Sequence, residues 1–203
     1  MLYELPMVFT SDGAPLAGTL VRNSASLSAR QRCVVVTGSW LSVKEQMALV
    51  YARALAERGF TAFTYDFSGW GESGGALRHW ELRMAPAYAV GDERAGMFFE
   101  LDYYANPARG AVKEWSNQMA ETSWLNWFSF DGLDPAPSVT TPTLLVHSDG
   151  CVFPDNAKTV HARLAGKKQL AWIDKGTQTD FYDVPEYVNT AADRAAAWFV
   201  ETL

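Results

Sequence analysis

The 203-residue sequence has few of the side chains that build metal centres and disulfide frameworks. It contains two cysteines and three histidines, and two cysteines are too few for the disulfide framework of a small secreted domain. We therefore expect a reduced, cytoplasmic setting. The histidines and acidic residues show no metal-ligand spacing such as H-E-x-x-H, and no glycine pattern of a dinucleotide site is complete. The sequence predicts no metal and no other cofactor.

Long apolar runs and clusters of positive charge are also missing. No apolar stretch approaches the roughly 20 residues that span a bilayer, and the N-terminus lacks the basic region and apolar run of a signal peptide. Lysine and arginine number 17 against 23 acidic residues, which gives a net charge of −6, and no basic run exceeds two residues. We therefore expect neither a membrane nor a nucleic-acid partner, and a small molecule remains as the expected ligand.

What the chain does contain is an alternation of strand and helix patterns near both ends. Runs of β-branched residues predict buried strands, and a turn at 11–13 predicts a hairpin between the first two. Ser42 and Glu45 have the spacing of a capping box at a helix start. The expected strands are 2–10, 15–22, 33–37, 61–67, 143–147 and 169–173, and the expected helices begin at Ser42, Asp155 and Pro185.

The middle of the chain, residues 84–141, has a different composition. It contains no isoleucine and is rich in alanine and aromatic residues, so we expect helices over 92–103, 107–119 and 122–129 instead of strands. The whole chain, residues 1–203, therefore predicts a single α/β domain. Its sheet is mainly parallel and carries an N-terminal hairpin, and the middle segment packs on it as a helical insertion or cap.

Several stretches resemble the α/β-hydrolase fold, and within it the dienelactone-hydrolase-related branch. In the first half these are residues 37–40, 43–47 and 66–75, and in the last third they are residues 145–149 and 180–185. The resemblance implies that Gly38, Ser39 and Trp40 turn backbone N–H groups toward a pocket, where one forms half of an oxyanion hole. It also implies that Asp149 is the acid that orients a catalytic histidine.

The nucleophile elbow of such a hydrolase is not found at the expected place. The one G-x-S-x-G match, residues 71–75, contains Ser73 but begins well after the predicted strand 61–67, whereas an elbow follows its strand directly. In complete members the resemblance implies a further strand, elbow, helix and strand after Arg83, and this chain lacks that block. If the sheet does not close up, its open edge invites pairing with a second copy, which favours a homodimer.

The catalytic base is also in question. Alignment of Asp180 and Pro185 with the family pattern places Gln178 where the histidine would stand, and glutamine cannot shuttle a proton near neutral pH. His147, at a predicted strand end, is the histidine that could replace it together with Asp149. The alternative for His147 is a hydrogen-bonded core histidine.

These observations leave three hypotheses about function. The leading one is a protein that keeps the pocket without the hydrolytic machinery and binds a small acyl or aromatic ligand, with contacts from Gly38, Ser39, Trp40, Ser73, Gln178 and Asp180. The second is an active ester, lactone or thioester hydrolase, or an acyl transferase, with a triad rearranged around Ser73 or Ser39, His147 and Asp149. The third is a structural or interaction protein, or an internal deletion of a longer hydrolase.

Overall fold

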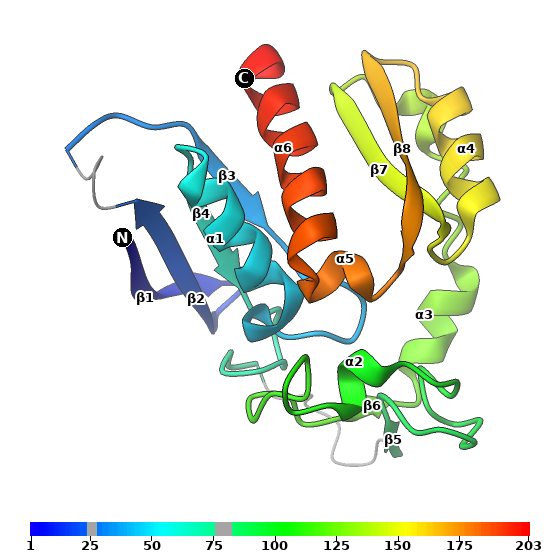
Figure 1. The fold of residues 1–203 in the computed structure, drawn as a ribbon. Helices are drawn as coiled ribbons and strands as arrows, with labels where there is room; N and C mark the ends of the chain where they lie inside the picture. The colour runs from blue at the N-terminus through cyan, green and yellow to red at the C-terminus, as the bar shows by residue number, and fades with distance from the viewer. Residues whose placement is uncertain (24–27, 76–82) are drawn as a thin grey trace. The chain divides into compact units, whose positions relative to one another are not determined.

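The computed structural model describes residues 1–23, 28–75 and 83–203 (Figure 1). The chain divides into two compact units, Met1–Asn126 and Trp127–Leu203, and the expectation of a single domain stays a prediction. Within the described ranges, no helix combines the length and the apolar character needed to cross a bilayer.

A four-stranded sheet with the strand order β1-β2-β4-β3 forms the core of the first unit. The predicted hairpin is confirmed as β1 (Leu2–Ser11) and β2 (Ala14–Asn23), and its turn contains Asp12 and Gly13 at positive φ. β4 (Thr61–Tyr65) pairs antiparallel with β2 and parallel with β3 (Cys33–Val36). The strand predictions for this half of the chain are therefore confirmed, with small differences at the ends.

One helical segment covers one face of this sheet. It consists of a wide turn, η2 (Lys44–Ala48), followed by α1 (Leu49–Glu57), and Gly59 at positive φ ends it as predicted. The strand register places Val21, Val34 and Ala62 side by side on one face of the sheet, and all three are buried. Figure 1 shows α1 lying along the strands that it covers.

The start of this segment corrects the predicted capping box. Ser42 donates its hydroxyl to the Ser39 carbonyl oxygen at 2.6 Å, so Ser42 closes a turn and does not cap a helix. The backbone N–H of Val43 instead donates to Gln46 Oε1 at 2.9 Å, which moves the side-chain cap one residue along the chain. Glu45 is thereby left to pair with Lys44.

The middle segment departs most from the sequence prediction. The helices predicted at 92–103 and 107–119 are wrong, and only the third is confirmed, as α3 (Ser123–Ser129). The segment contains the short helix α2 (Asp102–Ala105) and an antiparallel ribbon of β5 (Met84–Pro86) and β6 (Gln118–Ala120). A Cβ at Gly110 would clash with the Tyr103 ring, so close aromatic packing, and not helix formation, determines the path of the chain.

The second unit contains a parallel pair of strands and three helices. β7 (Thr143–Gly150) and β8 (Lys168–Thr177) confirm the two predicted strands of the last third. α4 begins one residue before the predicted cap Asp155, and a single 3₁₀ turn precedes β7. The helical elements are η3 (Ala136–Ser138), α4 (Pro154–Arg163), α5 (Asp180–Asp183) and α6 (Pro185–Thr202).

A buried indole hydrogen bond fixes the middle segment to the loop after β3. Trp115 Nε1 donates to the Leu41 carbonyl oxygen at 2.9 Å, and the Trp115 ring packs 5.3 Å from the Tyr104 ring. We predict that Trp115→Phe lowers the free energy of unfolding by about 2 kcal/mol, because phenylalanine keeps an aromatic ring but leaves that carbonyl without its donor. Urea unfolding monitored by circular dichroism measures the change.

Trp70→Phe is the matched control, because the half-buried Trp70 indole donates to no acceptor within the described residues. Its effect should stay within about 0.5 kcal/mol. Equal losses for the two variants would contradict the role given to the Trp115 hydrogen bond.

Candidate functional site

The predicted site residues fall into one group in each unit. Gly38, Ser39, Trp40 and Ser73 lie in loops of the first unit, and His147, Asp149, Gln178 and Asp180 lie in the second.

The loop after β3 is held by its own turn. The Ser39 carbonyl oxygen accepts both the hydroxyl and the backbone N–H of Ser42, and a Cβ at Gly38 would clash with the Ser42 hydroxyl. Leu41 adopts positive φ, which lets the chain reverse. Within the described residues, the backbone N–H groups of Ser39 and Leu41 donate to no protein acceptor. The loop therefore offers two donors for an external oxygen atom.

Aromatic side chains surround this loop. The Trp40 and Trp124 rings meet edge to face with centroids 5.7 Å apart, and about a third of the Trp40 surface is exposed. Ser39 Oγ lies 3.5 Å from the hydroxyl of the buried Tyr104. The aromatic residues thus do two things: Tyr104 and Trp115 support the loop from inside, and Trp40 with Trp124 forms an aromatic surface beside it.

A buried ion pair that the sequence patterns did not reveal lies behind the loop. Asp66, at the end of β4, is 1% exposed and Lys44 is 4% exposed. Lys44 Nζ lies 2.8 Å from Asp66 Oδ2, and the Lys44 backbone N–H donates to Asp66 Oδ1 at 2.6 Å. The ammonium also contacts Glu45 at 2.5 Å and Glu72 at 2.8 Å. One cation therefore connects the start of η2, the end of β4 and the glycine-rich loop, residues 69–75.

The contacts within this cluster shift the pKa values of its ionisable side chains. Burial disfavours the charged form of Lys44, but its hydrogen bonds with three carboxylates outweigh burial and raise the pKa of Lys44. The hydrogen bond from Lys44 lowers the pKa of the exposed Glu72. Burial raises the pKa of Glu45 despite its contact with Lys44, and Glu45 Oε2 is buried without a hydrogen-bond partner among the described residues.

The glycine-rich loop wraps around the Asp66 carboxylate. The Glu72 backbone N–H donates to Asp66 Oδ2 at 3.1 Å, and a Cβ at Gly71, where φ is positive, would clash with that carboxylate. Ser73 Oγ donates to the Asp66 carbonyl oxygen at 2.7 Å and accepts the Ala17 backbone N–H at 2.9 Å. The hydroxyl of the G-x-S-x-G match thus joins the loop to β2.

In the second unit, His147 and Asp149 each contact Trp172. The His147 ring stacks on Trp172 with centroids 5.3 Å apart, and its Nδ1 lies 2.9 Å from the Ser148 carbonyl oxygen. Asp149 Oδ2 accepts Trp172 Nε1 at 3.2 Å, while Asp149 Oδ1 lies 3.6 Å from Lys158 Nζ. β7 continues to Gly150, so Asp149 lies near its end, whereas His147, which was expected at a strand end, lies within the strand and pairs with Trp172. The Asp149 carboxylate is oriented by an indole and an ammonium group.

Gln178 and Asp180 organise the turn between β8 and α5. Gln178 Oε1 accepts the Val152 backbone N–H at 3.2 Å, and Gln178 Nε2 donates to the Tyr182 hydroxyl at 3.2 Å. Asp180 Oδ2 accepts the Thr177 backbone N–H at 2.7 Å. The Gln178 amide is therefore held at both of its ends.

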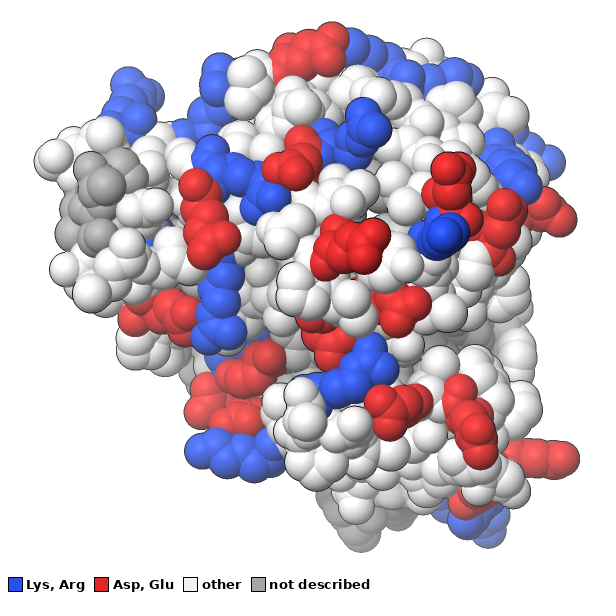
Figure 2. All heavy atoms as spheres, in the orientation of Figure 1, with Lys and Arg blue, Asp and Glu red and all other residues white. Residues whose placement is uncertain are grey.

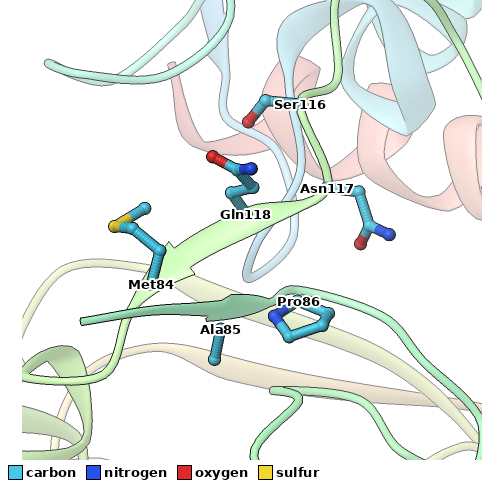
Figure 3. Close-up of a pocket in the computed structure, with 6 residues that line it drawn as sticks. All are labelled: Met84, Ala85, Pro86, Ser116, Asn117 and Gln118. Atoms are coloured by element: carbon cyan, nitrogen blue, oxygen red, sulfur yellow. The ribbon is translucent and has the colours of Figure 1, made fainter.

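A surface pocket of the first unit is lined by other residues than these. It has a volume of about 340 Å³ and lies beside the β5–β6 ribbon (Figure 3), lined by Met84, Ala85, Pro86, Ser116, Asn117 and Gln118. Its lining contains no charged side chain, and the Asn117 amide is already bonded to the backbone of Tyr88. The pocket therefore offers little chemistry for a specific ligand.

The distribution of charged side chains does not indicate a particular class of ligand either. In Figure 2, basic and acidic residues are interspersed over the visible face. No group of three or more His, Cys, Asp or Glu side chains that could hold a metal ion occurs in the described part of the chain.

The chain is similar in part of its sequence to two known proteins. No protein-family model matches it. Over 67 residues it is 39% identical to an uncharacterized protein of Pseudomonas aeruginosa, and over 76 residues it is 36% identical to the polyketide transferase ClaH of Penicillium crustosum. These matches cover 33% and 37% of this chain, but they span only 18% and 25% of the two relatives' own length.

The structural similarity extends over the whole chain. The crystal structure of a hypothetical protein from Pseudomonas aeruginosa matches with a TM-score of 0.80 at 19% identity, covering 100% of this chain and 94% of that one. The α/β hydrolase GrgF from Penicillium sp. sh18 matches with a TM-score of 0.72 at 15% identity, covering 100% and 99%. The chain has the α/β-hydrolase fold.

Because Glu45 and Glu72 share Lys44 but their pKa values shift in opposite directions, their variants should respond oppositely to pH. Glu45 has a folded-state pKa above its ordinary 4.5, so its ionisation destabilises the fold as pH rises, and the penalty is complete above the folded-state pKa. We predict that Glu45→Gln matches the wild type in acid and gains stability relative to it near neutral pH. Urea unfolding at the two pH values measures the difference.

Glu72→Gln is the control with the opposite sign. The lowered pKa of Glu72 means that its contribution is present above its ordinary value of 4.5 and is lost as pH falls through the folded-state pKa. This variant should lose stability near neutral pH and approach the wild type in acid. If both variants shift in the same direction between the two pH values, the charge balance described for Lys44 is wrong.

Proposed function

We propose that this α/β-hydrolase-fold protein is related to the dienelactone-hydrolase branch and binds a small acyl or aromatic ligand without hydrolysing it. The observation that carries the proposal is the state of Ser73. Its hydroxyl donates to the Asp66 carbonyl oxygen and accepts the Ala17 N–H, so both functions of the hydroxyl serve the backbone. A serine nucleophile needs a base at its hydroxyl proton, and here that proton is held by a carbonyl.

The groups of the second unit support the same proposal. The resemblance aligns Gln178 with the family base, and the Gln178 amide is bonded to Val152 and Tyr182. The Asp149 carboxylate accepts the Trp172 indole N–H, whereas a triad acid accepts the ring N–H of its histidine. The His147 ring stacks on Trp172, and its Nδ1 lies within hydrogen-bond distance of the Ser148 carbonyl oxygen. These three side chains of the second unit therefore hold neighbouring parts of the chain in place and are not arranged as a catalytic triad.

The loop after β3 supplies what a ligand needs. The backbone N–H groups of Ser39 and Leu41, which donate to no acceptor among the described residues, suit the oxygen of a carbonyl or carboxylate, as the donors of an oxyanion hole do. The Trp40 and Trp124 rings beside them suit an aromatic or apolar group. A small aromatic acid or acyl compound combines these two features.

Benzoate and phenylacetate are suitable probes, and isothermal titration calorimetry measures their binding. We predict that Trp40→Ala weakens binding at least about tenfold because it removes the aromatic contact, whereas Trp70→Ala leaves it unchanged. We also predict no turnover of 4-nitrophenyl acetate above that of Ser73→Ala. Binding that is insensitive to Trp40→Ala, or turnover that Ser73→Ala or His147→Ala abolishes, would overturn the proposal.

Acyl transfer is the second candidate, favoured by the sequence match with a polyketide transferase. It requires an activated nucleophile, which reacts with a fluorophosphonate far faster than a resting hydroxyl does. Mass spectrometry of the treated protein distinguishes the two candidates. A single modified serine would support transfer and contradict ligand binding without chemistry.

A further inference from the structure

The sheet of the first unit has an apolar face on the side opposite α1. Arg53 of α1 pairs with Glu4, which places the even-numbered residues of β1 on the side of the helix. The odd-numbered residues lie on the other side, where Phe9 packs against Phe63 and Tyr65 of β4 with centroids 5.7 and 5.5 Å apart. The strand register extends this side across all four strands. We define the aromatic face as Tyr3, Leu5, Met7, Phe9, Val35, Phe63 and Tyr65.

The aromatic face is exposed to solvent, although its residues are of types that usually form a protein core. Val35 is 63% exposed, and the four β1 members are between 37% and 48% exposed. Sheets in α/β proteins bury their apolar faces under other layers, and here one face packs against α1. A contiguous exposed apolar surface of this kind marks an interaction site.

The chemistry of the face restricts what can cover it. The four strands contain one basic residue, Arg22, and its guanidinium donates to the Ala29 carbonyl oxygen. A lipid surface is recognised by basic residues around an apolar face, and these strands do not supply them. Arg22 pairs with Tyr3 and therefore lies at one end of this face, while the other members of the face are uncharged. A flat, largely uncharged sheet face is complementary to another such face, since aligned sheets interdigitate their side chains about 10 Å apart.

We propose that the aromatic face is a homodimer interface, in which a second copy of this chain packs its own aromatic face on the first. Every copy carries the same apolar surface, so the pairing is self-complementary about a two-fold axis. The net charge of −6 does not oppose it locally, because the face itself carries no acidic residue.

The size of the face sets the expected affinity. Four strands and about eight residues along β1 cover roughly 20 by 25 Å, so two copies would bury about 1,000 Å² in total. Specific interfaces begin at about this size, so the dimer should be weak and should dissociate in the micromolar range.

Sedimentation velocity over a concentration series tests this proposal with neighbouring variants of one strand. The wild type should approach twice the monomer mass as concentration rises. Met7→Lys should raise the dissociation constant at least about tenfold, because it buries an unpaired charge in the interface. Val8→Lys is the matched control: Val8 is 73% exposed but points to the opposite side of β1, so dimerisation should not change.

Val35→Lys on β3 provides a second disruptive variant, and circular dichroism verifies that each variant is folded. A wild type that stays monomeric throughout the series would overturn the proposal, and so would equal effects of Met7→Lys and Val8→Lys. A wild type that stays monomeric but sediments with phosphatidylcholine vesicles would identify a lipid surface as the occupant and would also overturn it.

Discussion

The buried ion pair between Lys44 and Asp66 is the interaction on which the first unit depends. Removing two opposite charges from water is costly, and the attraction between them compensates only when further hydrogen bonds satisfy both groups. Asp66 obtains them from the backbone N–H groups of Lys44 and Glu72, and Lys44 from Glu45 and Glu72. The pair therefore fixes three pieces of chain together: the end of β4, the beginning of η2 and the glycine-rich loop.

The same ion pair explains why a sequence with the pattern of a nucleophile motif has a structural role here. Residues 71–75 read as a nucleophile motif, yet Gly71 is needed because the chain wraps around the Asp66 carboxylate, and Ser73 is needed to join that loop to β2. The neighbouring loop has features that suit the proposed ligand, since the N–H groups of Ser39 and Leu41 donate to no acceptor in the described part of the chain and Trp40 is exposed. A rigid loop framework with free donors is suited to binding a ligand in one orientation.

The sequence was sufficient for the strands but not for the middle segment or the ion pair. The runs at 33–36 and 143–147 are continuous and apolar, and the hairpin turn has a local signature, so their structure follows from short-range preferences. The segment after Pro86 is determined by distant contacts, such as that between Trp115 and Leu41, which no local periodicity encodes.

Lys44 and Asp66 are 22 residues apart, and only the pairing of β3 with β4 brings them together. The positions of Gln178 and Asp149 followed from the resemblance, but their partners Tyr182 and Trp172 did not.

A double-mutant cycle with Lys44→Met and Asp66→Asn tests the central role of this pair most directly. Lys44→Met leaves a buried carboxylate without its cation, so it should lower the free energy of unfolding by about 3–5 kcal/mol. Because Asp66→Asn removes that stranded charge, the double variant should be more stable than the sum of the single losses implies, by about 1–3 kcal/mol. Losses that add within about 0.5 kcal/mol would show that the two side chains act independently, and would contradict the account.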